Sequence, residues 1–229
     1  MKKYILSTFA LCFFLSSCKK EKVMSEKGGI DILSNVYFNA SKGLDSVKTY
    51  HISNINYDKN KIIEIVPDME LPELYSQLFL IKDSLCYPLG EFEEAKKVSI
   101  TEKLQKGKPF NVYKKEIGAI FSKQRLLNFH LRSILSDTIL FNKKYKRFEI
   151  KTSKSYTRYY VLENDTILPY ALYKKEAEEM GGRIERIDSY DRKNDIFVSM
   201  QLIPRKKWDS QAKEIFEYDQ FVNQKNTKK

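Results

Sequence analysis

The chain has 229 residues and a formal net charge of +11, because 41 Lys and Arg residues outnumber 30 Asp and Glu residues. With 42% hydrophobic and 31% charged residues, its composition is that of a globular protein and excludes a disordered or collagen-like chain. Three Cys residues exclude a disulfide framework, and two His residues exclude a histidine-rich metal site.

The first seventeen residues have the anatomy of a secretory signal. Lys2 and Lys3 precede an uncharged apolar stretch, residues 4–15, which is shorter than the roughly 20 residues that span a bilayer. The stretch ends in Leu15-Ser16-Ser17-Cys18, which resembles the lipobox of bacterial lipoproteins. The resemblance implies cleavage before Cys18, a diacylglyceryl thioether on its sulfur and acylation of the new amine. The alternative is an ordinary secreted protein with a chance Cys near its cleavage site.

An acylated Cys18 would anchor the chain in the cell envelope, and residues 18–29 are expected to form a tether between lipid and domain. Lys19 occupies the position at which an Asp retains enteric lipoproteins in the inner membrane, so the outer membrane is favoured. The periplasmic and the surface face both remain open. No segment after the leader approaches 18 consecutive apolar residues, so none is expected to span a membrane.

Residues 30–222 are expected to form a single β-rich domain. Apolar residues spaced three and four apart from Ile30 onward predict a helix that stops near Lys42. Residues 116–135 carry an apolar stripe that predicts a second helix, with a helix followed by a strand as the alternative. Three strands are expected between them, at 61–66, 77–81 and 85–89.

The pattern is clearest in the second half of the chain. Short polar links separate five segments rich in β-formers, which predict an antiparallel meander: 144–151, 156–162, 166–173, 183–190 and 196–203. Pro169 indicates an edge strand or a bulge in the third of them. A third helix is expected over 208–221, followed by a disordered tail, 223–229. Together these elements predict an α+β fold, in which helices pack on an antiparallel sheet.

Two stretches carry a further resemblance. One is Asn39-Ala40-Ser41-Lys42-Gly43 with the residues up to Lys48, at the exit of the first expected helix. The other is Asp165-Thr166-Ile167-Leu168-Pro169 in the meander. With the order of elements, they resemble the LolA/LolB-like superfamily of lipoprotein-sorting proteins. The resemblance implies a curved, incomplete antiparallel barrel whose helices close a concave, apolar cavity that holds acyl chains.

No motif for a reaction stands out: the sequence has no Gly-rich phosphate loop, nucleophile elbow, zincin motif or EF-hand loop. Cys86 is expected to be a small buried hydrophobe, because neither His51 nor His130 belongs to a Cys-His motif. The basic clusters at 143–147 and 205–207 suit a solvated face, or anionic headgroups or polysaccharide, better than nucleic acid. We therefore expect no enzymatic activity, no cofactor, no metal and no nucleic-acid partner.

Two functions from different classes follow. In the first, the chain is a lipid-anchored envelope protein that holds a lipid or another apolar ligand in a concave sheet. Six side chains of the meander would then line the cavity or the core: Tyr159, Val161, Leu168, Leu172, Val198 and Met200. In the second, it is a structural or interaction lipoprotein with a filled core, whose aromatic and basic surface binds an envelope protein or a glycan. An envelope hydrolase with an unrecognised site is a third hypothesis.

Overall fold

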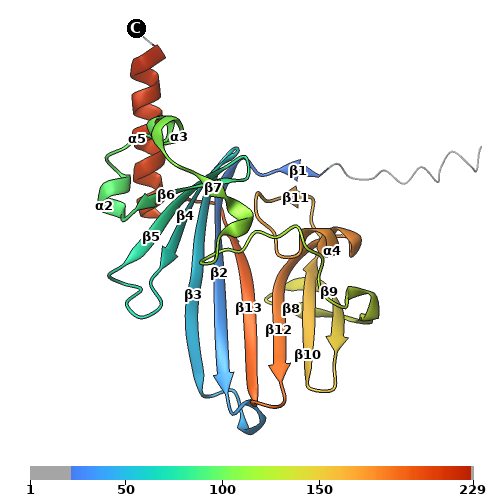
Figure 1. Ribbon diagram of the computed structural model, residues 1–229. Coiled ribbons are helices and arrows are strands. Elements are labelled where there is room, and N and C mark those ends of the chain that lie inside the picture. Colours follow the sequence, from blue (N-terminus) through green and yellow to red (C-terminus); the bar gives the residue numbers. More distant parts are fainter. Residues whose placement is uncertain (1–21, 228–229) are drawn as a thin grey trace, which may run out of the picture.

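A computed structural model describes residues 22–227 of the chain. Most of it is one antiparallel sheet of eleven strands, in the order β7-β6-β5-β4-β3-β2-β13-β12-β10-β9-β8 (Figure 1). The edge strands β7 and β8 do not pair with each other, so the sheet does not close into a barrel. The predicted fold class, a curved antiparallel sheet with a few helices packed on it, is confirmed. The predicted signal peptide and Cys18 lie outside the described residues.

The elements are bounded as follows. The large sheet contains β2 (Lys27–Phe38), β3 (Val47–Asp58), β4 (Lys61–Pro67), β5 (Ser76–Lys82), β6 (Leu85–Gly90), β7 (Phe110–Asn111), β8 (Ser133–Leu140), β9 (Lys143–Lys151), β10 (Ser155–Leu162), β12 (Arg183–Asp191) and β13 (Ile196–Arg205). A separate parallel pair joins β1 (Val23–Met24) to β11 (Thr166–Ile167). The α-helices are α2 (Phe92–Ala95), α3 (Ile100–Lys106), α4 (Lys174–Glu179) and α5 (Ser210–Thr227). Three 3-10 turns are η2 (Ala40–Lys42), η3 (Val112–Lys114) and η4 (Phe129–Leu131). None of the described helices is both long and apolar enough to cross a bilayer.

The larger core lies on the face of the sheet that residues 112–131 and 168–180 cover, which we call the inner face. Alternate residues of the strands, such as Ile30 and Ile32 on β2, point into it. Phe148 stacks on Tyr159 with ring centroids 4.6 Å apart, and Phe129 meets Phe148 edge-on at 5.4 Å. These aromatic contacts close the core beneath the covering segments.

A second core lies on the opposite, outer face, over β4, β5 and β6. Here α5 lays Ala212, Ile215 and Phe216 against the sheet, and α5 stands beside these strands in Figure 1. Both faces of β4 and β5 are therefore buried, which explains their nearly continuous apolar sequences. The helix predicted over 208–221 is confirmed, and it begins at Ser210.

The first predicted helix, residues 30–42, is wrong, because residues 27–38 form the central strand β2. A bulge between Ile32 and Leu33 shifts the register against β3 by one residue. The extra residue is Ile52 on β3, so the alternation of β2 itself is unbroken. Ile30 and Ile32 point to one face of β2 and Leu33 to the other, and apolar residues on both faces give spacings that imitate a helix. The stretch at 39–48, taken as a helix exit, instead holds the 3-10 turn η2 and the start of β3.

Two further predictions need correction. Residues 116–135 contain no α-helix: they cross the inner face irregularly, and only the strand of the alternative is present, from Ser133. The strand expected over 166–173 is limited to β11 and an isolated bridge at Leu172. Pro169 stands two positions after the end of β11, and it has no N–H with which to continue the pairing.

The expected ends of the domain differ from those in the structure. Residues 23–24 and 27–29, assigned to the tether, belong to β1 and β2. At the other end α5 continues through residue 227, so most of the expected tail is helical.

Candidate functional site

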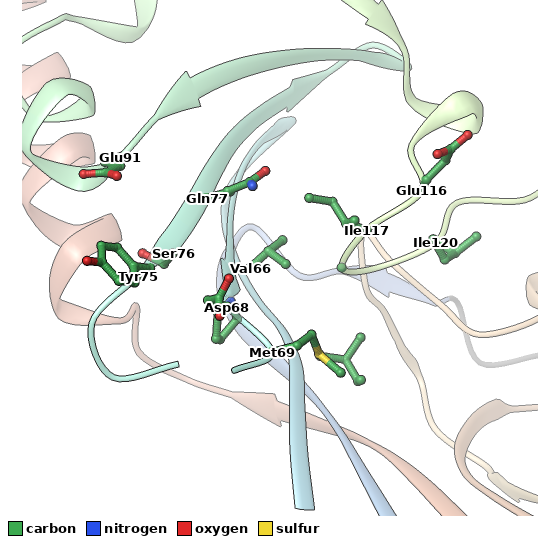
Figure 2. Close-up of a pocket in the computed structure, with 13 residues that line it drawn as sticks. Val66, Asp68, Met69, Tyr75, Ser76, Gln77, Glu91, Glu116, Ile117 and Ile120 are labelled. Carbon is green, nitrogen blue, oxygen red and sulfur yellow. The ribbon is translucent and has the colours of Figure 1, made fainter. Parts of the chain in front are cut away.

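A cavity of about 600 Å³ opens on the inner face, where the end of β4 meets the segment 112–131 that crosses the sheet (Figure 2). We call residues 112–131 the crossing segment. The cavity is lined by Ile52, Val66, Pro67, Asp68, Met69, Tyr75, Ser76, Gln77, Glu91, Glu116, Ile117, Gly118 and Ile120. Its volume falls within the range of sites that bind small molecules, about 300–1,000 Å³.

The β4–β5 connection builds one wall. Val66, near the end of β4, points to the inner face and packs into the larger core. Asp68 then starts the turn: its Oδ1 accepts hydrogen bonds from the backbone N–H groups of Glu70 at 2.8 Å and Leu71 at 2.9 Å. These bonds hold the pKa of Asp68 below its usual value. The fixed turn carries Met69, which lines the cavity.

A buried ion pair fastens the crossing segment to the sheet. Glu64 of β4 and Lys115 are almost fully buried, and the Lys115 Nζ lies 3.0 Å from the Glu64 carboxylate. The carboxylate also accepts hydrogen bonds from the Ser53 hydroxyl at 2.8 Å and the Ala119 N–H at 2.6 Å. Lys115 donates a further, short bond to the carbonyl of Ile117. Burial raises the pKa of Glu64, and the Lys115 ammonium opposes that shift.

Gly118 lets the crossing segment approach β4 closely. Its φ is +68°, in the left-handed region. A Cβ at this position would run into the Glu64 Oε1 and a methyl group of Val66. The backbone therefore passes directly over β4. Its path at Gly118 fixes the directions in which the neighbouring side chains, Ile117 and Ala119, point. Ala119 is buried, whereas Ile117 turns to the cavity.

The lining combines apolar side chains with three carboxylates. In Figure 2 Asp68 lies beside Val66 in the middle of the view, and Glu91 and Glu116 lie on opposite sides of it. The other apolar lining side chains include Met69, Ile117 and Ile120. No lining residue is Lys or Arg within the part of the chain that the structure describes. Such a lining suits an apolar ligand whose polar end is neutral or cationic, because an anionic end would meet carboxylates without a counter-charge.

Five of the six residues predicted to line a cavity or core belong to the larger core or pack against it. Tyr159, Val161, Leu168 and Leu172 are buried in the larger cluster, and Met200 packs against it. Val198 is half-buried on β13. None of the six lines the cavity described above.

Sequence reasoning missed the residues that do line it. Ile117 and Ile120 stand three apart, which reads as helical periodicity in isolation. The glycine between them is the available signal that the segment is not a helix, because Gly118 adopts a left-handed conformation. Met69 and Tyr75 lie in a connection that no periodicity marks.

The other sequence candidates do not assemble into a reactive site. Cys86 is fully buried, and burial raises the pKa of its thiol to about 12, which is the opposite of an activated nucleophile. His51 and His130 are both exposed. Across residues 22–227 no group of three or more His, Cys, Asp or Glu residues could hold a metal ion.

Ion pairs neutralise much of the basic cluster at 143–147. Lys143 lies 3.1 Å from Glu185, Lys144 lies 3.0 Å from Asp137, and Lys146 lies 3.3 Å from Glu163. The Arg147 guanidinium donates to the backbone carbonyl of Ser136 at 2.8 Å. Because each cation has a local partner, this cluster offers little free charge to a polyanion.

Comparisons with known proteins give only distant likenesses. No family model and no curated protein matches the chain. Among solved structures, LprF from Mycobacterium bovis has a TM-score of 0.34 at 8% identity, over 77% of this chain and 84% of LprF. A DUF1329 family protein from Desulfovibrio piger has a TM-score of 0.26 at 10% identity, over 80% of this chain and 86% of that protein. At these scores the likenesses say nothing about a ligand or an activity.

Proposed function

We propose that the chain is a lipid-anchored envelope protein that holds a neutral lipid or another apolar ligand in the inner-face cavity and catalyses no reaction. The observation that carries the proposal is the cavity itself, whose mouth exposes apolar side chains. Met69, Tyr75, Ile117 and Ile120 line it and are all exposed. Leu71 and Leu74, in the same connection as Met69 and Tyr75, are exposed as well. A gathering of exposed apolar side chains around a hollow is typical of a binding site.

The anchor rests on the sequence. The leader, its apolar stretch and the lipobox-like Leu15-Ser16-Ser17-Cys18 follow one another in the order that lipoprotein processing requires. Replacing Cys18 by Ser is expected to abolish labelling with a clickable fatty acid and to leave an unprocessed or soluble form. A Cys18→Ser chain that still takes up the label would refute the anchor.

Ligand binding is tested with the chain from Lys19 onward. Native mass spectrometry and lipid extraction of the purified chain should show a co-purifying apolar species at stoichiometric amounts. In a second assay, the neutral fluorophore N-phenyl-1-naphthylamine is titrated into the delipidated chain. Saturable fluorescence enhancement is expected, because the probe is apolar and carries no negative charge that the lining carboxylates would repel.

Two matched double variants locate the binding. Ile117→Glu with Ile120→Glu places charge in the cavity, where the parent side chains are 43% and 51% exposed. Ile134→Glu with Ile139→Glu changes side chains that are 65% and 71% exposed on β8, outside the cavity. The first pair should weaken probe binding at least tenfold, which corresponds to about 1.4 kcal/mol. Equal loss in both variants, or in neither, would contradict the cavity as the binding site.

A second function, an interaction lipoprotein without a ligand, is favoured by one observation. Apolar side chains are exposed on the edge strand β8, namely Ile134 and Ile139, and in the residues on either side of it, namely Leu127, Leu131 and Phe141. An exposed strand edge can add a strand from another chain. A clean ligand-free mass together with no saturable probe binding would move this function ahead.

A further inference from the structure

The chain is fixed to the body of the domain from Val23 onward. The Val23 N–H donates to the carbonyl of Asp165 at 2.8 Å, and the Ser25 N–H donates to that of Ile167 at 2.9 Å. The Ser25 hydroxyl lies 2.8 Å from the hydroxyl of Tyr57, which is buried. These contacts place β1 on one end of the large sheet, beside β11, as Figure 1 shows. We call this end of the molecule the β1 end.

The reach of the proposed anchor is short. Cys18 stands five positions before Val23, and a fully extended chain covers at most about 3.6 Å per residue, or about 18 Å. Strand β13 alone has 10 residues and rises about 30 Å from Ile196 to Arg205. Its register brings Arg205 opposite Gly29, at the β1 end. The lipid can therefore reach the bilayer only if the β1 end stays near the membrane.

Exposed lysines surround the β1 end. Lys22 and Lys27 flank β1 in the sequence, and the Lys59 N–H donates to the carbonyl of Glu26. Lys206 and Lys207 follow the end of β13, and Lys27 lies over the ring of the adjacent Trp208. Of these five lysines, none forms an ion pair with another described residue.

Four acidic residues lie in the same region, Glu26, Asp58, Asp165 and Asp209, and the five lysines outnumber them. The side chains of β1 itself, Val23 and Met24, are apolar and exposed. Such a surface is complementary to an anionic bilayer. The headgroups attract the unpaired lysines, and the bilayer interface accepts the exposed apolar side chains.

We propose that the β1 end is a membrane-contact surface that docks on anionic lipid headgroups, so that the domain stands on the bilayer in one orientation. The proposal rests on the proposed acylation of Cys18. It has a consequence for the cavity. β4 starts at Lys61 beside the β1 end and runs for seven residues, about 20 Å, to the connection that lines the cavity. The cavity would then lie about 20 Å along β4 from the end that contacts the bilayer.

The test uses the processed, acylated chain reconstituted in vesicles of 70% phosphatidylcholine and 30% phosphatidylglycerol, values chosen as about those of an anionic membrane surface. A thiol-reactive fluorophore is attached at Lys206→Cys, at the β1 end, or at Lys193→Cys, in the turn at the opposite end of β13. Both parent lysines are exposed. Cys86 is buried and should take no label, which the unsubstituted chain controls for.

A fraction of the lipids then carries a nitroxide quencher on the headgroup. We expect strong quenching of the fluorophore at position 206 and little at position 193. Equal quenching at the two positions, stronger quenching at 193, or no quenching at either while the chain floats with the vesicles overturns the proposed orientation. A chain that does not float contradicts the anchor itself, so failure of the proposed function is visible separately.

Charge is tested with matched triple variants in the same labelled chains. Replacing Lys22, Lys59 and Lys207 by Gln removes cations at the β1 end, whereas replacing Lys42, Lys48 and Lys154 by Gln removes the same charge at the opposite end. The first set should reduce quenching at position 206 on anionic vesicles, and the second should leave it unchanged. Equal effects of the two sets would overturn the role of the lysines.

Discussion

The outer face of the sheet is covered in two different ways along its width. Over β4, β5 and β6 the cover is α5, which buries Ile215 and Phe216 on an apolar surface. Over β9, β10 and β12 none of the helices within residues 22–227 covers the outer face, which carries charged residues and tyrosines instead. Arg158 lies 2.8 Å from Glu149, and Arg186 lies 2.8 Å from Asp188.

The carboxylates of the uncovered half are nevertheless buried. The Glu185 side chain is 4% exposed, because Lys143, the Tyr145 hydroxyl and Arg183 all donate to it at 2.6–3.1 Å. Long basic and tyrosine side chains thus shield the sheet from water as a helix does elsewhere. The comparison teaches that a strand face can be closed by its own polar side chains. Because these side chains lie at the surface, water can solvate a carboxylate whose basic partner is substituted. Five predictions test this difference between the helix-covered and the uncovered half, in order from the largest expected effect to the smallest.

The helix-covered half should lose the most when one apolar side chain is removed. Phe216→Ala is expected to lower the free energy of unfolding by about 4 kcal/mol, because a fully buried aromatic ring leaves a cavity. Urea unfolding measures the change. The control is Phe221→Ala on the same helix, where the side chain is 54% exposed and the expected change is within about 0.5 kcal/mol. Equal losses would mean that α5 does not dock as described.

A buried ion pair on the inner face can be compared with an exposed one on the outer face. Lys115→Met leaves the buried Glu64 without its partner and should cost about 3 kcal/mol. The matched change Lys151→Met, at an exposed partner of Glu149 on the outer face, should cost less than about 1 kcal/mol. The pKa of Glu64 is already above its usual 4.5 in the folded chain, so Lys115→Met should gain stability as the pH falls toward 4.5 and lose it as the pH rises. Unfolding curves across that range check the sign.

A third change addresses the backbone of the crossing segment. Gly118→Ala should cost about 2 kcal/mol, because the position has φ +68° and the new Cβ would collide with Glu64 and Val66. It should also weaken probe binding, because Ile117 moves with the backbone. Gly43→Ala is the control: its φ is also positive, at +138°, but its Cβ would meet only the Asp45 carboxylate at 3.3 Å. A Gly118→Ala chain with unchanged stability would show that the segment does not lie so close to β4.

On the uncovered half of the outer face, removing a cation should be mild. Arg186→Met is expected to cost about 1 kcal/mol, because water can approach Asp188 once the guanidinium is gone. Raising the ionic strength should reduce the difference in the free energy of unfolding between the parent chain and Arg186→Met. The difference between the parent chain and Phe216→Ala should not change. Parallel urea titrations at low and high salt measure both, and a salt-independent cost would indicate that the pair is sealed from water.

The smallest expected signal concerns Cys86. The chain from Lys19 onward contains this single Cys, and burial raises the pKa of its thiol to about 12. Iodoacetamide at pH 8 should therefore leave the folded chain unmodified and alkylate it once guanidinium has unfolded it. Mass spectrometry reads the adduct. Rapid alkylation of the folded chain would place Cys86 at an accessible site and reopen its role as a nucleophile.

Much of the fold could be predicted from the sequence where one physical signal dominated. The strands at 144–151, 156–162, 183–190 and 196–203 were marked by β-formers and polar turns, and all four are present. The helix prediction for residues 30–42 failed because β2 carries apolar side chains on both faces, Ile30 and Ile32 on one and Leu33 and Tyr37 on the other. Their spacings of three and four fit a helix as well as a central strand, and local periodicity cannot choose between the two.

The cavity could not be predicted for a related reason. Its walls join Ile52 of β3 and Val66 of β4 to Ile117 and Ile120 of the crossing segment, and only the folded sheet brings these together. The core residues Tyr159 and Val161 looked equally suitable in the sequence, because an apolar side chain that fills a core and one that lines a cavity have the same chemistry. The difference lies in what covers them.

The position of β2 has a mechanical consequence if Cys18 is acylated as proposed. A pull on the anchor would load the short β1–β11 pair first and then β2. Strand β2 lies sixth of the eleven strands and pairs with β13 and β3 over nearly its whole length. The force would run along the strand, so many hydrogen bonds of both neighbours would share the load at once instead of breaking one after another. A chain acylated as proposed would thus bear a pull from its anchor on a strand that has a hydrogen-bonded neighbour on each side.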